Sequence, residues 1–113
     1  MIIDTHCHAG KNWFLPIESL EFEMDRAGVE GAVLIQHGGT YDNDYLFEES
    51  GKRNNRFKVV VLVDPEDEDP IGSLEKLAER GAAGIRIGPD DEFNFLTDAT
   101  DIWRKAGDLN LVV

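Results

Sequence analysis

The feature that most constrains this chain is a regular alternation of short apolar runs with segments of helical periodicity. The apolar runs are expected to be strands and occupy residues 2–7, 31–36, 57–63, 84–87 and 109–113. The segments between them, 15–27, 42–52, 71–80 and 98–106, carry apolar residues at helical spacing. Runs that lack polar alternation are typical of strands buried on both faces. The alternation therefore predicts an α/β protein with a parallel sheet and outer helices.

These segments make four βα units and the opening of a fifth. A barrel of eight such units takes about 250 residues, whereas the chain has 113 and ends on Leu111-Val112-Val113, inside the expected fifth strand. We therefore expect residues 1–113 to be one domain, the N-terminal half of a (β/α)8 TIM barrel cut inside strand five. A small open sheet is the alternative.

The end of the first expected strand carries Asp4-Thr5-His6-Cys7-His8. Side chains two residues apart on a strand share a face, so His6 and His8 are expected to point the same way. Asp4 lies two residues before His6 and is expected on the same face. Two neutral imidazoles can hold one metal ion; a histidine pair without a metal is the alternative. Cys7 falls on the opposite face, where a buried and inert thiol is expected rather than a third ligand.

Composition limits the partners and the location. The net charge of −12 argues against binding nucleic acid or an anionic membrane, which require a basic surface. The acidic runs at 66–69 and 90–92 are expected to be solvated loops, with a second metal site as the alternative. Cys7 is the only cysteine, which excludes an intrachain disulfide and favours a reducing compartment. With no leader pattern and no apolar run of membrane-spanning length, the expected location is cytoplasmic.

The segment Ile2-Ile3-Asp4-Thr5-His6-Cys7-His8 resembles the start of the amidohydrolase superfamily, in particular its amidohydrolase-related branch of metal-dependent TIM-barrel hydrolases. Residues 24–29, 32–36, 41–45, 56–57, 63–65 and 84–87 match that family in order and spacing, so the resemblance covers nearly all of the chain. It implies that His6 and His8 are two ligands of a divalent metal ion, expected to be Zn²⁺. The family completes its site with histidines and an aspartate from later strands. Catalytic residues are therefore expected beyond residue 113, and the chain alone is expected to be inactive.

Three residues at the ends of later strands are expected to contact a substrate. His37 and Tyr41 follow the second strand. Arg86 lies in the fourth, where a guanidinium can pair with a substrate carboxylate in a bidentate manner. The structural alternatives are an exposed loop position for His37, loop packing for Tyr41 and an ion pair with a helix carboxylate for Arg86. Asp64, before a proline, is expected to cap a turn.

The resemblance implies an enzyme that activates a metal-bound water to cleave an ester, lactone or amide bond in a small carboxylated molecule. A metal-assisted decarboxylase of the same superfamily is the first alternative. Lactonases that work without metal, in which the histidine pair would bind substrate directly, are a second. A non-catalytic half-barrel that pairs with a copy of itself or with another fragment is a third, so a homo-oligomer is compatible with the sequence. A metal-dependent deoxyribonuclease is disfavoured by the net charge.

Overall fold

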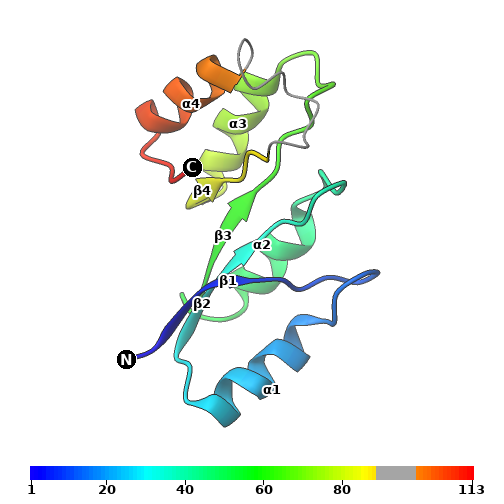
Figure 1. The fold of residues 1–113 in the computed structure, drawn as a ribbon, viewed down its shortest axis with the longest axis vertical. Coiled ribbons are helices and arrows are strands. Elements are labelled where there is room, and N and C mark those ends of the chain that lie inside the picture. The colour runs from blue at the N-terminus through cyan, green and yellow to red at the C-terminus, as the bar shows by residue number, and fades with distance from the viewer. Residues whose placement is uncertain (89–98) are drawn as a thin grey trace.

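The computed structural model describes residues 1–88 and 99–113, which form a four-stranded sheet and its helices (Figure 1). The elements follow in the order β1 (Ile3–Cys7), α1 (Ile17–Ala27), β2 (Gly31–Ile35), α2 (Asp44–Gly51), β3 (Phe57–Val61), α3 (Pro70–Glu79), β4 (Gly84–Ile85) and α4 (Ala99–Asp108). The strands lie in the order β1-β2-β3-β4, and every neighbouring pair is parallel. The prediction of a parallel α/β fold is confirmed. The acidic run at 90–92 lies outside the described residues.

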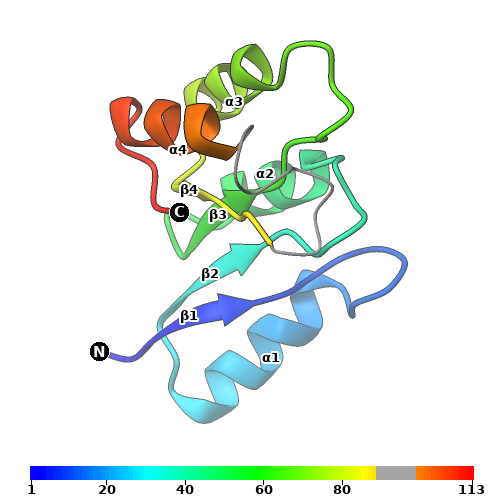
Figure 2. The ribbon, with the colours of Figure 1, turned by 45° about the horizontal axis from the view of Figure 1, so that its top comes forward.

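The strands all point the same way, so their carboxyl ends meet at one edge of the sheet (Figure 2). The loops that follow β1, β2 and β3 leave from this edge. Functional side chains in open parallel sheets and barrels gather at this edge. Sequential strand order therefore brings the loops after residues 7, 35 and 61 to one mouth.

The expected start of a fifth strand lies beside β4, where the Val112 carbonyl accepts from the Ile85 N–H at 2.8 Å and the Val112 N–H donates to the Ala83 carbonyl at 3.1 Å. Residues 109–113 are described, yet they contribute only an isolated parallel bridge between Gly84 and Val112. Gly84 allows this contact because a Cβ atom at that position would lie 2.7 Å from the Val112 carbonyl oxygen. The chain returns to the edge of β4, where a fifth strand would pair, without forming a regular strand there.

The first helix begins two residues later than expected. It starts at Ile17 with Pro16 at the N-cap, where the ring fixes φ near the helical value and no backbone N–H is left unpaired. It ends as predicted at Gly28, whose φ of 71° is left-handed. The second helix starts at Asp44, two residues later than expected, after Asn43 at its N-cap.

One face of the sheet packs against helices, and none of the described helices covers the other. On β2, Ala32 and Leu34 are buried, whereas Val33 and Ile35 are only partly covered. The core on the helix side includes Ile17, Met24, Leu34, Leu46, Val59, Val61, Leu74, Ile85 and Ile102. This alternation is that of a sheet with an outer helical layer and a concave inner face. Among the described helices, none is long and apolar enough for a membrane span.

Candidate metal and substrate site

His6 and His8 meet at the carboxyl end of β1. Their Nε2 atoms are 3.2 Å apart, and their rings are nearly perpendicular, with centroids 5.0 Å apart. Two imidazole nitrogens that bind one tetrahedral Zn²⁺ at 2.0–2.1 Å lie about 3.3 Å from each other. The pair already has the spacing that two ligands of a single ion require.

The backbone of the neighbouring strand orients His8. The His8 Nδ1 atom lies 2.7 Å from the Ile35 carbonyl oxygen. A carbonyl only accepts, so Nδ1 carries the proton and Nε2 keeps its lone pair for a metal ion. Metal-binding histidines commonly donate their second nitrogen to such a carbonyl, which fixes both tautomer and ring direction. His6 Nε2–H therefore donates to His8 Nε2, and His6 would have to carry its proton on Nδ1 to offer Nε2 to a metal ion.

An irregularity in β1 sets the direction of these side chains. The register with β2 shifts between Asp4 and Cys7, so the first strand holds one extra residue there. The Asp4 Oδ1 atom accepts a hydrogen bond of 2.9 Å from the His6 backbone N–H. That bond, together with one from the Cys7 thiol, lowers the pKa of the Asp4 carboxyl. Asp4 therefore supports the backbone of the histidine pair.

Cys7 faces the helix side of the sheet, as predicted, and its side chain is buried in the core at 7% exposure. Burial, with the hydrogen bond to Asp4, raises the pKa of its thiol to about 12. Thiolate is the reactive form, so a buried thiol that stays protonated reacts slowly.

We expect Cys7 in the folded chain to react with a thiol reagent at pH 8 at least about 100-fold more slowly than in the urea-unfolded chain. The comparison uses dithionitrobenzoate, with release of the coloured thiolate followed by absorbance. Equal rates in the folded and unfolded chain would contradict the buried position of this side chain.

The loop after β1 adds a group of aromatic rings beside the histidine pair. Phe14 stacks on His8 with ring centroids 4.6 Å apart and an interplanar angle of 23°. Trp13 stacks on Phe14 at 5.5 Å. His37, from the loop after β2, contacts both Trp13 and Phe14, at 5.3 and 5.2 Å.

The structure thus brings the predicted site residue His37 into the same ring group as His8. Its imidazole is partly buried, and Thr40 Oγ1 lies 3.3 Å from its Nδ1 atom. The sequence reasoning missed Trp13 and Phe14. The available signal was two adjacent aromatic residues directly after the strand that carries the histidines.

Arg86 and His6 line one cavity on the open face of the sheet, with a volume of about 480 Å³. The Arg86 Nη1 atom donates to the Gln36 carbonyl oxygen at 3.2 Å, at the carboxyl end of β2. Within residues 1–88 and 99–113, no carboxylate forms an ion pair with this guanidinium. The rest of the lining is mostly apolar and includes Val33, Ile35, Val60 and Ile87. A positive group and one histidine of the pair therefore share an apolar concave surface.

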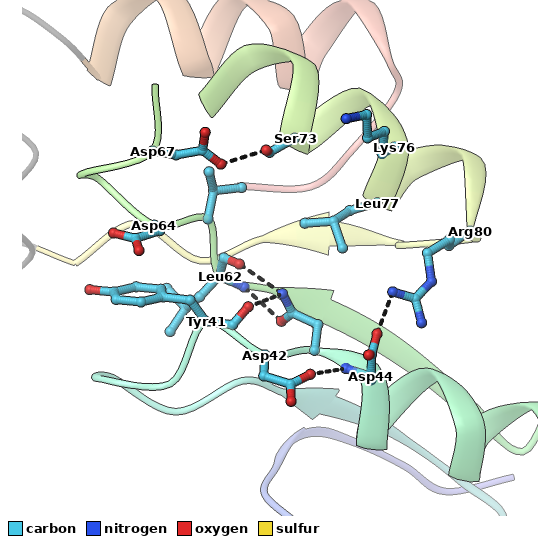
Figure 3. A pocket seen from close by; sticks show the side chains of 12 residues that line it. Tyr41, Asp42, Asp44, Leu62, Asp64, Asp67, Ser73, Lys76, Leu77 and Arg80 are labelled. Carbon is cyan, nitrogen blue, oxygen red and sulfur yellow. Dashed lines mark hydrogen bonds and ion pairs between the residues drawn. The ribbon is translucent and has the colours of Figure 1, made fainter. Parts of the chain in front are cut away.

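Tyr41 lies elsewhere. It lines a second cavity of about 390 Å³ between α2, α3 and the loop after β3, together with Asp64, Lys76 and Arg80 (Figure 3). Asp64 accepts a hydrogen bond from the Glu66 backbone N–H, which confirms the expected turn. The structure does not place Tyr41 in the cavity that contains His6 and Arg86.

Asn43 explains why the loop that carries Tyr41 lies there. This buried amide donates to the carbonyl oxygens of Leu62 and Tyr41, at 2.9 and 3.1 Å, and accepts from the Leu62 N–H at 3.2 Å. Its side chain pairs with the backbone after β3 as a neighbouring strand would, and it therefore connects the loop after β2 to the loop after β3. No sequence signal distinguished Asn43 from an ordinary helix cap.

The described residues contain no group of three or more histidine, cysteine or acidic side chains placed to hold a metal ion. His6 and His8 fit a divalent ion as two of its ligands, by spacing and by tautomer. A tetrahedral ion held by this pair would need two further ligands, which water can supply.

A parallel sheet in sequential order, open on its concave face and carrying a histidine pair at the end of its first strand, is the opening half of a TIM barrel. The chain belongs to the amidohydrolase family, whose model matches residues 3–113. A search of curated proteins finds no match.

Two solved structures share this fold. One is a probable 2-pyrone-4,6-dicarboxylic acid hydrolase from Acinetobacter baumannii with citric acid bound, at 19% identity and a TM-score of 0.76. The other is a protein of Agrobacterium tumefaciens in its apo form, at 19% identity and a TM-score of 0.71. The match covers 97% of this chain in both cases, but only 47% and 45% of those chains. The chain thus spans about half the length of the structures it resembles.

Proposed function

We propose that this chain supplies the first two metal ligands of a hydrolase that cleaves an ester, lactone or amide bond in a small carboxylated molecule. The observation that carries the proposal is the histidine pair, with Nε2 atoms 3.2 Å apart and His8 oriented by the Ile35 carbonyl. A bound Zn²⁺ would lower the pKa of its water towards neutrality and polarise the substrate carbonyl.

Within this proposal, the chain's own residues bind and orient. His8 offers a lone pair whose direction is set before metal arrives, because its other nitrogen is held by the backbone. His6 is more exposed and completes the pair by changing tautomer. Neither residue is free to act as the general base while it binds the metal, so proton transfer falls to a group outside the described residues.

The position of Arg86 supports the proposal that the substrate carries a carboxylate. Its guanidinium lines the same cavity as His6, so a carboxylate bound there would place the rest of the molecule on the metal side of the open face. The Acinetobacter neighbour is named for a dicarboxylic acid and holds citric acid, which agrees with that substrate class. His37 is a second candidate contact through the ring group beside His8. Tyr41 stays a prediction, because it lines a different cavity.

Turnover is tested with 2-pyrone-4,6-dicarboxylate as the probe and ring opening followed by absorbance. The 113-residue chain with Zn²⁺ is expected to show no turnover, because two ligands without a positioned base do not activate water. A polypeptide in which a second half-barrel follows Val113 is expected to be active, and chelation of its metal should remove the activity.

Two results would overturn parts of this account. Activity of the longer polypeptide that survives replacement of both histidines would contradict the proposed function. Turnover by the 113-residue chain that is lost in His6→Ala would show that further ligands are dispensable. Release of CO₂ in place of ring opening would favour the decarboxylase alternative.

A further inference from the structure

The backbone ladder between β2 and β3 ends one hydrogen bond early. The Gln36 N–H donates to the Val60 carbonyl at 2.9 Å, and the strand register places Ile35 opposite Val60. A parallel ladder in this register continues from the Gln36 carbonyl to the Leu62 N–H. In the part of the chain that the structure describes, that bond is replaced: the Leu62 N–H donates to the Asn43 Oδ1 atom at 3.2 Å. The Gln36 carbonyl is therefore left without its ladder donor.

The side chain of Asn43 takes both backbone groups of Leu62. Its Nδ2 donates to the Leu62 carbonyl at 2.9 Å, and its Oδ1 accepts from the Leu62 N–H. A carboxamide carries a donor and an acceptor side by side, so it can stand in for a neighbouring strand. A buried N–H needs an acceptor, and this amide, only 4% exposed, supplies one in place of the Gln36 carbonyl.

The guanidinium of Arg86 uses the acceptor that Leu62 leaves. Its Nη1 donates to the Gln36 carbonyl at 3.2 Å, while the Arg86 backbone N–H donates to the Val61 carbonyl at 2.9 Å. The backbone of Arg86 thus pairs with β3, and its side chain crosses β3 to reach the end of β2. The guanidinium makes no other hydrogen bond to the described residues. Its edge formed by Nε and Nη2 therefore stays available for a carboxylate.

We propose that Asn43 is the positioning residue of Arg86: by accepting from the Leu62 N–H, it ends the β2–β3 ladder and leaves the Gln36 carbonyl to anchor the guanidinium. An anchored guanidinium presents its free edge in one direction, so a carboxylate that binds there does not have to immobilise it. The role of Arg86 as a carboxylate contact rests on the proposed function. The anchor itself can be tested without substrate or metal.

NMR of the unmodified 113-residue chain tests the interrupted ladder through scalar couplings across hydrogen bonds. A coupling is expected from the Leu62 amide nitrogen to the side-chain carbonyl carbon of Asn43, and none to the Gln36 carbonyl carbon. The order parameter of the Arg86 Nε–H bond is expected above about 0.6, the value below which a group counts as flexible. A coupling from Leu62 to Gln36, or a flexible Arg86, would overturn the proposal.

Two variants of Asn43 separate the acceptor from the rest of the amide. Asn43→Leu has a similar size but no acceptor, so the Leu62 N–H should couple to the Gln36 carbonyl and the Arg86 order parameter should fall below about 0.6. Asn43→Asp keeps an oxygen acceptor and should keep Arg86 ordered. Release of Arg86 in both variants, or in neither, would contradict the positioning role.

Val59→Ala is the matched control for lost stability. Val59 is a buried β3 residue, 2% exposed, and its truncation leaves the acceptor of the Leu62 N–H unchanged. Its Arg86 order parameter should match that of the unmodified chain. A fall as large as that in Asn43→Leu would mean that destabilisation alone releases Arg86, and the proposal would be wrong.

Binding of malonate, followed by amide chemical shifts, distinguishes this proposal from the proposed function. Asn43→Leu should weaken malonate binding by roughly two- to tenfold, the range expected when one flexible side chain must be ordered on binding. Arg86→Ala should weaken it at least as much. If Arg86→Ala had no effect, the carboxylate contact of the proposed function alone would be contradicted. If only Arg86→Ala had an effect, the positioning role of Asn43 would be overturned.

Discussion

Replacing His6 and His8 together with alanine should weaken Zn²⁺ binding by more than about 100-fold, because the change removes both ligands. Removing a residue that only hydrogen-bonds to a metal ligand already lowers metal affinity by about 10- to 100-fold. Titration calorimetry of the metal-free chain measures the effect directly. Binding by the unmodified chain should also weaken at acid pH, since protons and metal compete for the imidazole nitrogens.

His37→Ala is the matched control for this prediction. It removes the third histidine of the chain, which contacts Trp13 and Phe14 and is not one of the proposed ligands. Its Zn²⁺ affinity should stay close to that of the unmodified chain. If the double variant bound Zn²⁺ as tightly as the unmodified chain, the histidine pair would not be the metal site.

Leu34→Ala should lower the free energy of unfolding by about 2–5 kcal/mol, the usual cost of truncating a fully buried leucine. Leu34 is 0% exposed at the centre of β2, and its Cα is the register partner of Cys7 in β1. A cavity at this point loosens the strand end that carries His6 and His8, so zinc affinity should fall as well. Urea unfolding followed by circular dichroism gives the stability change.

Val33→Ala changes the adjacent residue on the open face of the same strand. Val33 is only partly covered, so its truncation should cost less than about 1 kcal/mol and should not depend on protein concentration. A loss as large as that of Leu34→Ala would show that something covers the concave face in solution. A loss that shrinks with dilution would indicate a second copy of the chain, as the half-barrel alternative requires, because that copy covers Val33 only at high protein concentration.

Properties that depend on local periodicity were predictable from the sequence alone. The parallel α/β fold followed from five apolar runs that alternate with helical segments, and the first four of them form parallel strands. The common direction of His6 and His8 followed from their spacing on one strand, and the burial of Cys7 followed from its place between them. Each of these needs only the geometry of a strand and its immediate neighbours.

Properties that join distant segments were decided by the tertiary structure. The bond from His8 to Ile35 spans 27 positions, and that from Arg86 to Gln36 spans 50. The register of β1 against β2, including its extra residue, determines which carbonyl faces the imidazole. The packing of two loops likewise places His37 against Phe14 and sends Tyr41 to another cavity. Residue spacing sets which face of a strand a side chain occupies, but strand register and loop packing decide what it touches.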